Sequence, residues 1–153
     1  MQNKLIIRSK HMIFCEQKFS FLVKMLRIDT TINERFHETE VGVNFSFTLC
    51  DVNKLCRVCH YYGEVLVLSI TLVLSKACTS AVIRYRTKEA VAAAEGTFLR
   101  AIQANDLRIT LMVGGYPLFV NGKIAGAISA GGETESQSCV ITKYMVSVFK
   151  ALI

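Results

Sequence analysis

The sequence is poor in proline and in charge: a single proline occurs among 153 residues, and only 20% of the residues are charged. These shortages exclude a proline-rich linker and argue against intrinsic disorder, which goes with high charge and few apolar residues. Apolar residues make up 52% of the chain, and a chain of this length buries most of the surface that its unfolded form exposes. We therefore expect one domain over residues 17–153, preceded by an N-terminal extension at residues 1–16.

No segment concentrates the basic residues, although the formal net charge is +6. The densest basic patch consists of Arg84, Arg86 and Lys88. Nucleic-acid binding requires clustered cations that neutralise phosphates, usually with stacking aromatic side chains nearby. We therefore expect a solvated basic surface and no nucleic-acid partner.

The start of the sequence, residues 1–15, lacks the continuous apolar run of a signal peptide. Residues 65–83 are long enough to span a membrane, but Lys76 lies among them, and a lysine in mid-span costs about 3 kcal/mol. Most of the cysteines fall in segments that resemble regular apolar elements, where free cysteine behaves as a small hydrophobic residue; the six are Cys15, Cys50, Cys56, Cys59, Cys78 and Cys139. These features predict a cytoplasmic protein without a membrane span.

Helical spacing of apolar residues predicts three long helices and one short one. They cover residues 21–36, a segment with Ser69 as N-cap and an apolar stripe of Ile70, Val73, Leu74, Ala77 and Ala81, the alanine-rich residues 88–95, and residues 135–152 with a capping box from Thr134 and Gln137. Alternation of apolar and polar residues predicts about five antiparallel strands, at residues 41–50, 55–61, 107–113, 116–120 and 123–130. Asn121-Gly122 between the last two strands favours a type I′ turn, and the predicted class is α+β.

The glycine-rich segment after residue 113 resembles the C-terminal signature of the GlcG/haem-binding family, which also includes a haem-degrading protein and the C-terminal domain of some corrinoid adenosyltransferases. The resemblance is carried by Gly114-Gly115-Tyr116-Pro117-Leu118, Asn121-Gly122-Lys123-Ile124, Gly126-Ala127-Ile128 and Gly131-Gly132, and upstream by Ser69-Ile70, Lys76-Ala77, Thr79 and Arg86-Thr87. It extends over roughly residues 43–150. It implies a profilin-like, three-layer α/β/α fold with a five-stranded antiparallel sheet, assembly into homo-oligomers, and haem or a related tetrapyrrole as ligand.

Three acidic positions of this family are replaced. His60-Tyr61-Tyr62 stands where the family has Arg-x-Asp, Thr71 where it has an aspartate, and Ser136-Gln137-Ser138 where it has Glu-Gln-Asp. The sequence also contains no Ser-His-Asp order, no metal-spaced histidine pair and no catalytic carboxylate pair. We therefore expect a binding protein and name no catalytic residue.

The predicted ligand site combines the central helix with the glycine pair. Lys76 lies in so apolar a run that its ammonium needs a partner, and a propionate together with the Thr79 hydroxyl would supply one. The alternative is a lysine at a subunit interface. Gly114 and Gly115 allow close approach of either a flat ligand or a second subunit.

Cys56-Arg57-Val58-Cys59-His60 matches the C-x-x-C-H pattern of covalent haem attachment. In an extended strand, Cys56 and Cys59 point to opposite faces, which argues against that reading and favours ordinary strand residues over a thiol-pair or metal role. His60 alone remains a candidate haem-iron ligand, with a surface histidine as the alternative.

The sequence thus predicts a homo-oligomeric protein that binds a small molecule, with haem as the expected cofactor. The alternative is a non-catalytic accessory or scaffold subunit in glycolate, diol or corrinoid metabolism. The cofactor-binding candidates are Lys76, Thr79, His60, Gly114 and Gly115, and the metal-ligand candidate is His60.

Overall fold

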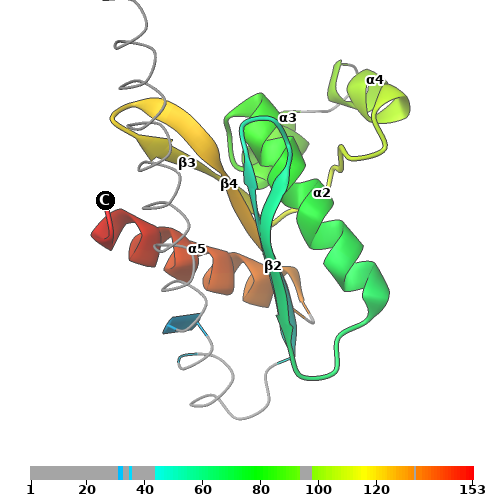
Figure 1. The fold of residues 1–153 in the computed structure, drawn as a ribbon. Coiled ribbons are helices and arrows are strands. Elements are labelled where there is room, and N and C mark those ends of the chain that lie inside the picture. Colours follow the sequence, from blue (N-terminus) through cyan, green and yellow to red (C-terminus); the bar gives the residue numbers. More distant parts are fainter. Residues whose placement is uncertain (1–30, 33–34, 36–43, 94–97, 133) are drawn as a thin grey trace, which may run out of the picture.

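The computed structural model describes residues 31–32, 35, 44–93, 98–132 and 134–153. Within these ranges the chain forms a mixed α/β fold around one antiparallel sheet of four strands (Figure 1). The elements follow one another as β1 (Phe45–Asp51), β2 (Cys56–Tyr62), α2 (Val67–Ile83), α3 (Thr87–Ala93), α4 (Phe98–Asn105), β3 (Gly115–Val120), β4 (Lys123–Gly131) and α5 (Glu135–Ala151).

The strand order in the sheet is β2-β1-β4-β3, so β2 and β3 are the two edges. Both predicted hairpins are confirmed, since β1 pairs with β2 and β3 pairs with β4. Asn121 and Gly122 have φ values of 50° and 74°, and two successive positive φ values are what a type I′ turn requires. The alternation in β1 predicted a half-buried strand, but both of its faces are buried because it is a central strand between two helix layers.

The fifth strand, predicted at residues 107–113, is absent from this described stretch, which runs as turn and irregular chain. Its backbone is held by other bonds: Ile109 N donates to the Asp106 carbonyl (2.9 Å) and Thr110 N to the Thr79 hydroxyl (2.8 Å). The predicted helix over residues 21–36 lies outside the described residues, apart from the helical Thr31 and Ile32 and the single residue Arg35.

The capping residues in the sequence predict the end of one helix correctly and misplace the ends of others. At α5 the capping box is confirmed, because Gln137 N donates to Thr134 Oγ1 and Thr134 N to Gln137 Oε1, both at 3.1 Å. Helix α2 begins earlier than predicted: its N-cap is Leu66, which offers no side-chain bond, and Ser69 lies in the first turn with its hydroxyl 2.9 Å from Ser46 Oγ. Helix α3 begins at Thr87, one residue early, and α4 was not predicted.

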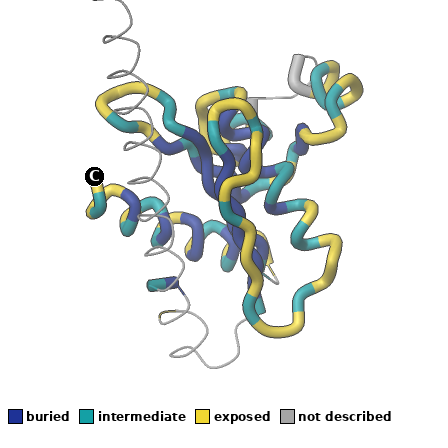
Figure 2. The backbone as a smooth tube through the Cα atoms, in the orientation of Figure 1, coloured by how far each residue is buried: buried dark blue, intermediate teal, exposed yellow. Residues whose placement is uncertain are grey.

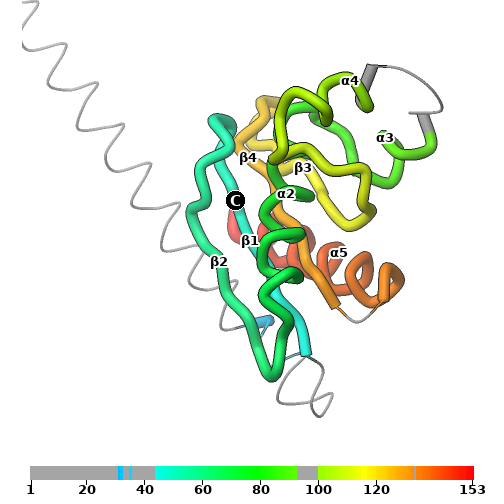
Figure 3. Tube along the Cα trace, turned by 90° about the vertical axis from the view of Figure 1, so that its right-hand side faces the viewer, coloured from blue at the N-terminus to red at the C-terminus, as the bar shows by residue number. Residues whose placement is uncertain are grey.

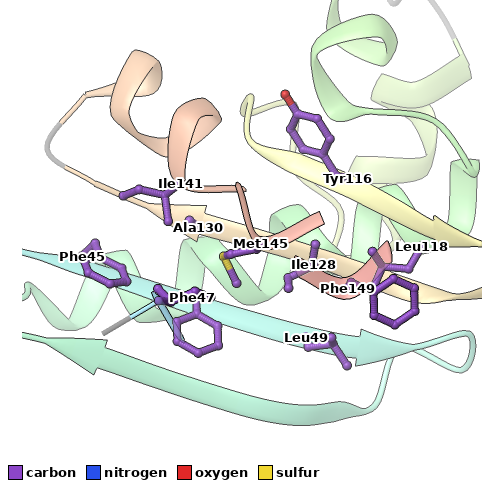
Figure 4. Packing of buried hydrophobic residues seen from close by; sticks show 11 residues of the cluster. Phe45, Phe47, Leu49, Tyr116, Leu118, Ile128, Ala130, Ile141, Met145 and Phe149 are labelled. Carbon is purple, nitrogen blue, oxygen red and sulfur yellow. The ribbon is translucent and has the colours of Figure 1, made fainter. Parts of the chain in front are cut away.

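The two faces of the sheet are covered by different helices (Figure 3). On the α5 face lies a core of large apolar side chains (Figure 4), including Phe45, Phe47, Leu49, Ile128, Ile141, Met145 and Phe149. The α2 face packs small residues: Cys50, Ala77, Cys78, Ala81 and Ala127. The sheet therefore carries most of its apolar core on one side.

Helix α2 buries polar side chains and exposes apolar ones. Lys76, Thr79 and Ser80 are buried, whereas Leu66, Val67 and Leu68 at its start are 77%, 79% and 64% exposed (Figure 2). Of the seven buried residues of α2, only Val73, Ala77 and Ala81 are among the apolar positions that predicted this helix. Among the described residues, no helix is both long and apolar enough to cross a bilayer.

Candidate functional site

The side chain of Lys76 is the centre of the candidate site. It leaves the middle of α2 and is only 4% exposed. A Cβ placed on Gly114 would lie 3.5 Å from both its Cδ and its Nζ, and 3.3 Å from the Ala130 carbonyl. The ammonium therefore lies beneath the backbone at the start of β3, next to the end of β4.

The ammonium of Lys76 has no hydrogen bond or ion pair with any residue that the structure describes. Burial lowers the pKa of Lys76 from its usual 10.5, and the charges of Glu135 and Cys139 at the start of α5 act in the opposite direction. A buried charge without a bonded partner is costly in free energy. The site is thus a cationic position that an anionic group could complete.

Cys139 lies beside Lys76 and Tyr116 lies beside Cys139, and the sequence analysis named neither as a site residue. Burial raises the pKa of Tyr116, and the neighbouring Cys139 thiol adds to this increase. The guanidinium carbon of Arg86 lies 5.2 Å from the centre of the Tyr116 ring. Cys139 follows Glu135 by four residues, and this spacing in the sequence indicates that both side chains share a face of α5.

Glycine is required at positions 114 and 115 for two different structural reasons. Gly114 has a φ of 124°, which residues other than glycine rarely adopt. Its carbonyl accepts a hydrogen bond from the Thr142 hydroxyl at 3.1 Å. At Gly115 a Cβ would lie 2.3 Å from the Lys76 carbonyl and 2.8 Å from Thr87 Cγ2. Gly115 therefore brings β3 against α2, which places the Lys76 side chain next to Gly114.

The Thr79 hydroxyl is engaged within the protein. It donates to the Ser75 carbonyl and accepts from Thr110 N, both at 2.8 Å. Thr79 is completely buried in this arrangement. It fastens the segment before β3 to α2 and so supports the position of Gly114.

His60 lies far from Lys76, on the exposed edge strand β2. Its ring centre is 5.0 Å from that of Tyr62 and 6.3 Å from that of Phe47, on the α5 side of the sheet. Gly114 precedes β3 at the opposite edge, and three strand spacings of about 4.8 Å separate the two edges by about 14 Å. The structure thus brings Lys76, Gly114 and Gly115 together and places His60 apart from them.

The statement that Cys56 and Cys59 point to opposite faces is wrong, because β2 contains a bulge. Leu49 pairs with Val58 but Cys50 pairs with Cys56, so Arg57 is an extra residue. Cys59 pairs with Thr48, and the Thr48 hydroxyl also lies 3.5 Å from Cys56 Sγ. Both thiols therefore lie on the same side of the strand, whereas His60 lies on the other.

A shallow pocket adjoins the start of α2. It is lined by Asn44, Val65, Leu66 and Ser69 and by the glycine pair at the end of β4, Gly131 and Gly132. Gly132 N donates to the Ser138 hydroxyl at 3.0 Å. This hydrogen bond joins Gly132, just after β4, to Ser138 of α5.

Comparison with known proteins gives matches over most of the chain. The model of a family described as "Haem degrading protein HbpS-like" matches residues 25–145. An uncharacterised 15.0 kDa protein of Citrobacter freundii, named for its place in the dhaT-dhaS intergenic region, is 29% identical over 115 residues, which are 74% of this chain and 81% of that protein.

Solved structures share the fold at low identity. Klebsiella pneumoniae protein ORFY has a TM-score of 0.76 at 24% identity, over 86% of this chain and 91% of that one. A PduOC:haem complex has a TM-score of 0.71 at 19% identity, over 82% and 91%. A double mutant of Streptomyces reticuli HbpS has a TM-score of 0.69 at 16% identity, over 83% and 84%. Because the family match spans most of the sequence, this chain belongs to the HbpS-like family of haem-degrading proteins.

Proposed function

We propose that the protein binds haem or a related tetrapyrrole in the cytoplasm as a homo-oligomer, and that the Lys76 ammonium holds a carboxylate of the ligand. The observation that carries the proposal is the buried charge of Lys76 under the Gly114 backbone, which is bonded to none of the residues that the structure describes. A propionate would supply the missing negative charge, and a charge-assisted hydrogen bond is among the stronger ones in proteins.

The residues around Lys76 fit the acidic end of such a ligand. Gly114 puts no side chain over the ammonium, and the exposed Arg86, which lies against the Tyr116 ring, adds a second positive charge. Haem, when bound, supplies an iron centre that takes axial ligands from the protein. The family description and the related PduOC:haem complex support haem as the ligand.

His60 and Lys76 do not face one site within the chain, because His60 points to the α5 side of the sheet beside Phe47, whereas Lys76 extends from α2 on the other side. His60 as an iron ligand therefore requires a neighbouring subunit that brings its β2 edge to the Lys76 site. Cys139 lies beside Lys76 on the same chain, and a cysteine thiolate can also bind haem iron. These two arrangements predict different spectra.

The exposed start of α2 supports self-association. Leu66, Val67 and Leu68 are consecutive large apolar residues on the surface, and contiguous apolar surface commonly marks an interaction site. A second copy of the chain is the partner that we propose for it. Size-exclusion chromatography should give an oligomer, and replacing Leu66 and Val67 by glutamate should reduce its size.

Haemin titration tests the proposal. The wild-type protein should show a saturable Soret shift at micromolar haemin, and Lys76→Met should weaken binding by about tenfold, equivalent to about 1.4 kcal/mol. Lys143→Met is the matched control, because Lys143 lies exposed on α5 and its loss should leave the titration unchanged. The absence of a saturable shift in the wild type would refute the proposal, and a colourless oligomer would favour the accessory-subunit alternative.

The axial ligand is tested separately. Cys139→Ser should change the Soret position if the thiolate binds iron within one chain, whereas His60→Ala should change it if the ligand comes from a neighbouring subunit. Spectra of the haem complex recorded at protein concentrations above and below subunit dissociation distinguish the two, because only the His60 spectrum depends on assembly.

A further inference from the structure

Strand β2 presents two thiols side by side on its outer edge. Cys56 and Cys59 are both free and exposed. The extra residue Arg57 turns a spacing that would put them on opposite faces into one that puts them on the same face. The Thr48 hydroxyl, 3.5 Å from Cys56 Sγ and directly across from Cys59, marks their common position.

The bulge that aligns these thiols is held in place by Asp51. Arg57 Nε donates to Asp51 Oδ2 at 2.9 Å, and the other carboxylate oxygen accepts Asn53 N at 2.8 Å and Leu55 N at 3.0 Å. The Thr48 hydroxyl donates to the Val58 carbonyl at 2.8 Å and so holds the centre of the bulge. The two thiols are therefore arranged before any ligand arrives.

The bulge also shortens the distance between the two cysteines. Cys56 pairs with Cys50 and Cys59 pairs with Thr48, so the two cysteines are separated by only two residues of β1, about 7 Å along the strand. Both sulfur atoms can therefore reach one cation that lies between them.

The ligand set selects the class of cation. Zinc requires four ligands, and the described residues contain no cluster of three or more metal-ligating side chains. Thiolates prefer soft ions such as Cu(I), which is stable with two sulfur ligands.

We propose that Cys56 and Cys59 form a two-thiolate site for a soft monovalent cation, Cu(I) above all, on the α2 side of the edge strand β2. The site is independent of the proposed tetrapyrrole site, since it lies at the opposite edge of the sheet and uses neither Lys76 nor Cys139. Binding displaces the two thiol protons to solvent and involves no change of oxidation state.

Anaerobic competition with the Cu(I)–bicinchoninate complex tests the site on the full-length chain. The wild type should remove one Cu(I) per chain at this site, and Cys56→Ser and Cys59→Ser should each weaken that binding by at least about tenfold. Cys139→Ser is the control and should bind as the wild type does. Equal affinity in all four proteins, or a loss shared by Cys139→Ser, would overturn the proposal.

A second variant keeps the number of thiols but moves one to the other face. In Cys59→Ser combined with His60→Cys, the new thiol points to the α5 side, and Cu(I) affinity should remain as low as in Cys59→Ser. Recovery of affinity would refute the face argument.

Discussion

The two helix layers pack against the sheet with different chemistry. On the α5 side, phenylalanine, leucine, isoleucine and methionine side chains fill the interior, and on the α2 side alanine, cysteine, serine and threonine do. Large apolar side chains contribute more free energy of burial than small ones. The α5 layer should therefore supply most of the stability, while the α2 layer keeps the backbones close and holds the buried ammonium of Lys76.

The largest expected effect is the loss of a phenylalanine from the α5 layer. Phe47 is 1% exposed, and Phe47→Ala should lower the free energy of unfolding by about 3–5 kcal/mol, because it removes apolar burial and leaves a cavity. Urea or guanidinium unfolding measures this change. Phe119→Ala, at a site 44% exposed on β3, should cost less than about 1 kcal/mol; equal costs would abolish the contrast between core and surface.

The second-largest expected effect comes from disturbing the close contact between β3 and α2. Gly115→Ala puts a Cβ 2.3 Å from the Lys76 carbonyl, so the strand and the helix must separate, at an expected cost of about 2–3 kcal/mol. The control is Gly122→Ala, where nothing lies within 4 Å and only the positive φ opposes a side chain, at about 1 kcal/mol. Haemin affinity should fall in Gly115→Ala and not in Gly122→Ala. A Gly115→Ala protein as stable as the wild type would show that the two layers can move apart freely.

A stabilising change is expected at the buried ammonium. Lys76→Met should raise the free energy of unfolding at neutral pH by about 1 kcal/mol, because an apolar side chain of similar length avoids the desolvation of a charge. The same variant should lose ligand affinity, so stability and binding should change in opposite directions. A destabilised Lys76→Met protein would mean that the ammonium already has a compensating partner.

The pH dependence gives a second measurement of the same residue. Burial lowers the folded-state pKa of Lys76 below 10.5, so the unfolded chain binds more protons between the two values and stability rises with pH there. The penalty is complete below the folded pKa and is relieved as the pH approaches 10.5. The advantage of Lys76→Met over the wild type should therefore shrink in alkaline buffers, and an advantage independent of pH would exclude the ammonium as its cause.

The parts of the fold that local chemistry determines could be predicted from the sequence. Asn121-Gly122 meets a positive-φ requirement within two residues, and Thr134 with Gln137 completes a cap within one turn. The strand predicted at residues 107–113 fails because Thr79, thirty-one residues earlier, binds the backbone of Thr110. Apolar alternation carries no information about such a distant partner.

The parts of the candidate site that lie within one helix or strand could be predicted from the sequence. The parts that depend on the order of the strands could not. Lys76 in an apolar helix already signals a costly charge, and the structure places it against Gly114. His60 was grouped with them because the strand order, which sets it at the opposite edge, cannot be derived from the pattern of one strand. The bulge at Arg57 was missed for a similar reason, since only pairing with β1 reveals it.

The smallest effect tests whether hydrogen bonds bind α2 to the sheet. Ser46 Oγ and Ser69 Oγ lie 2.9 Å apart, and Ser46 is completely buried on the α2 side of β1. Ser46→Ala should cost about 1 kcal/mol, because it leaves the Ser69 hydroxyl without this partner, whereas the double variant with Ser69→Ala should cost little more than the single one. A double-mutant cycle by urea unfolding measures the coupling. Additive costs would mean that the two hydroxyls do not interact, and the α2 layer would then rest on close packing alone.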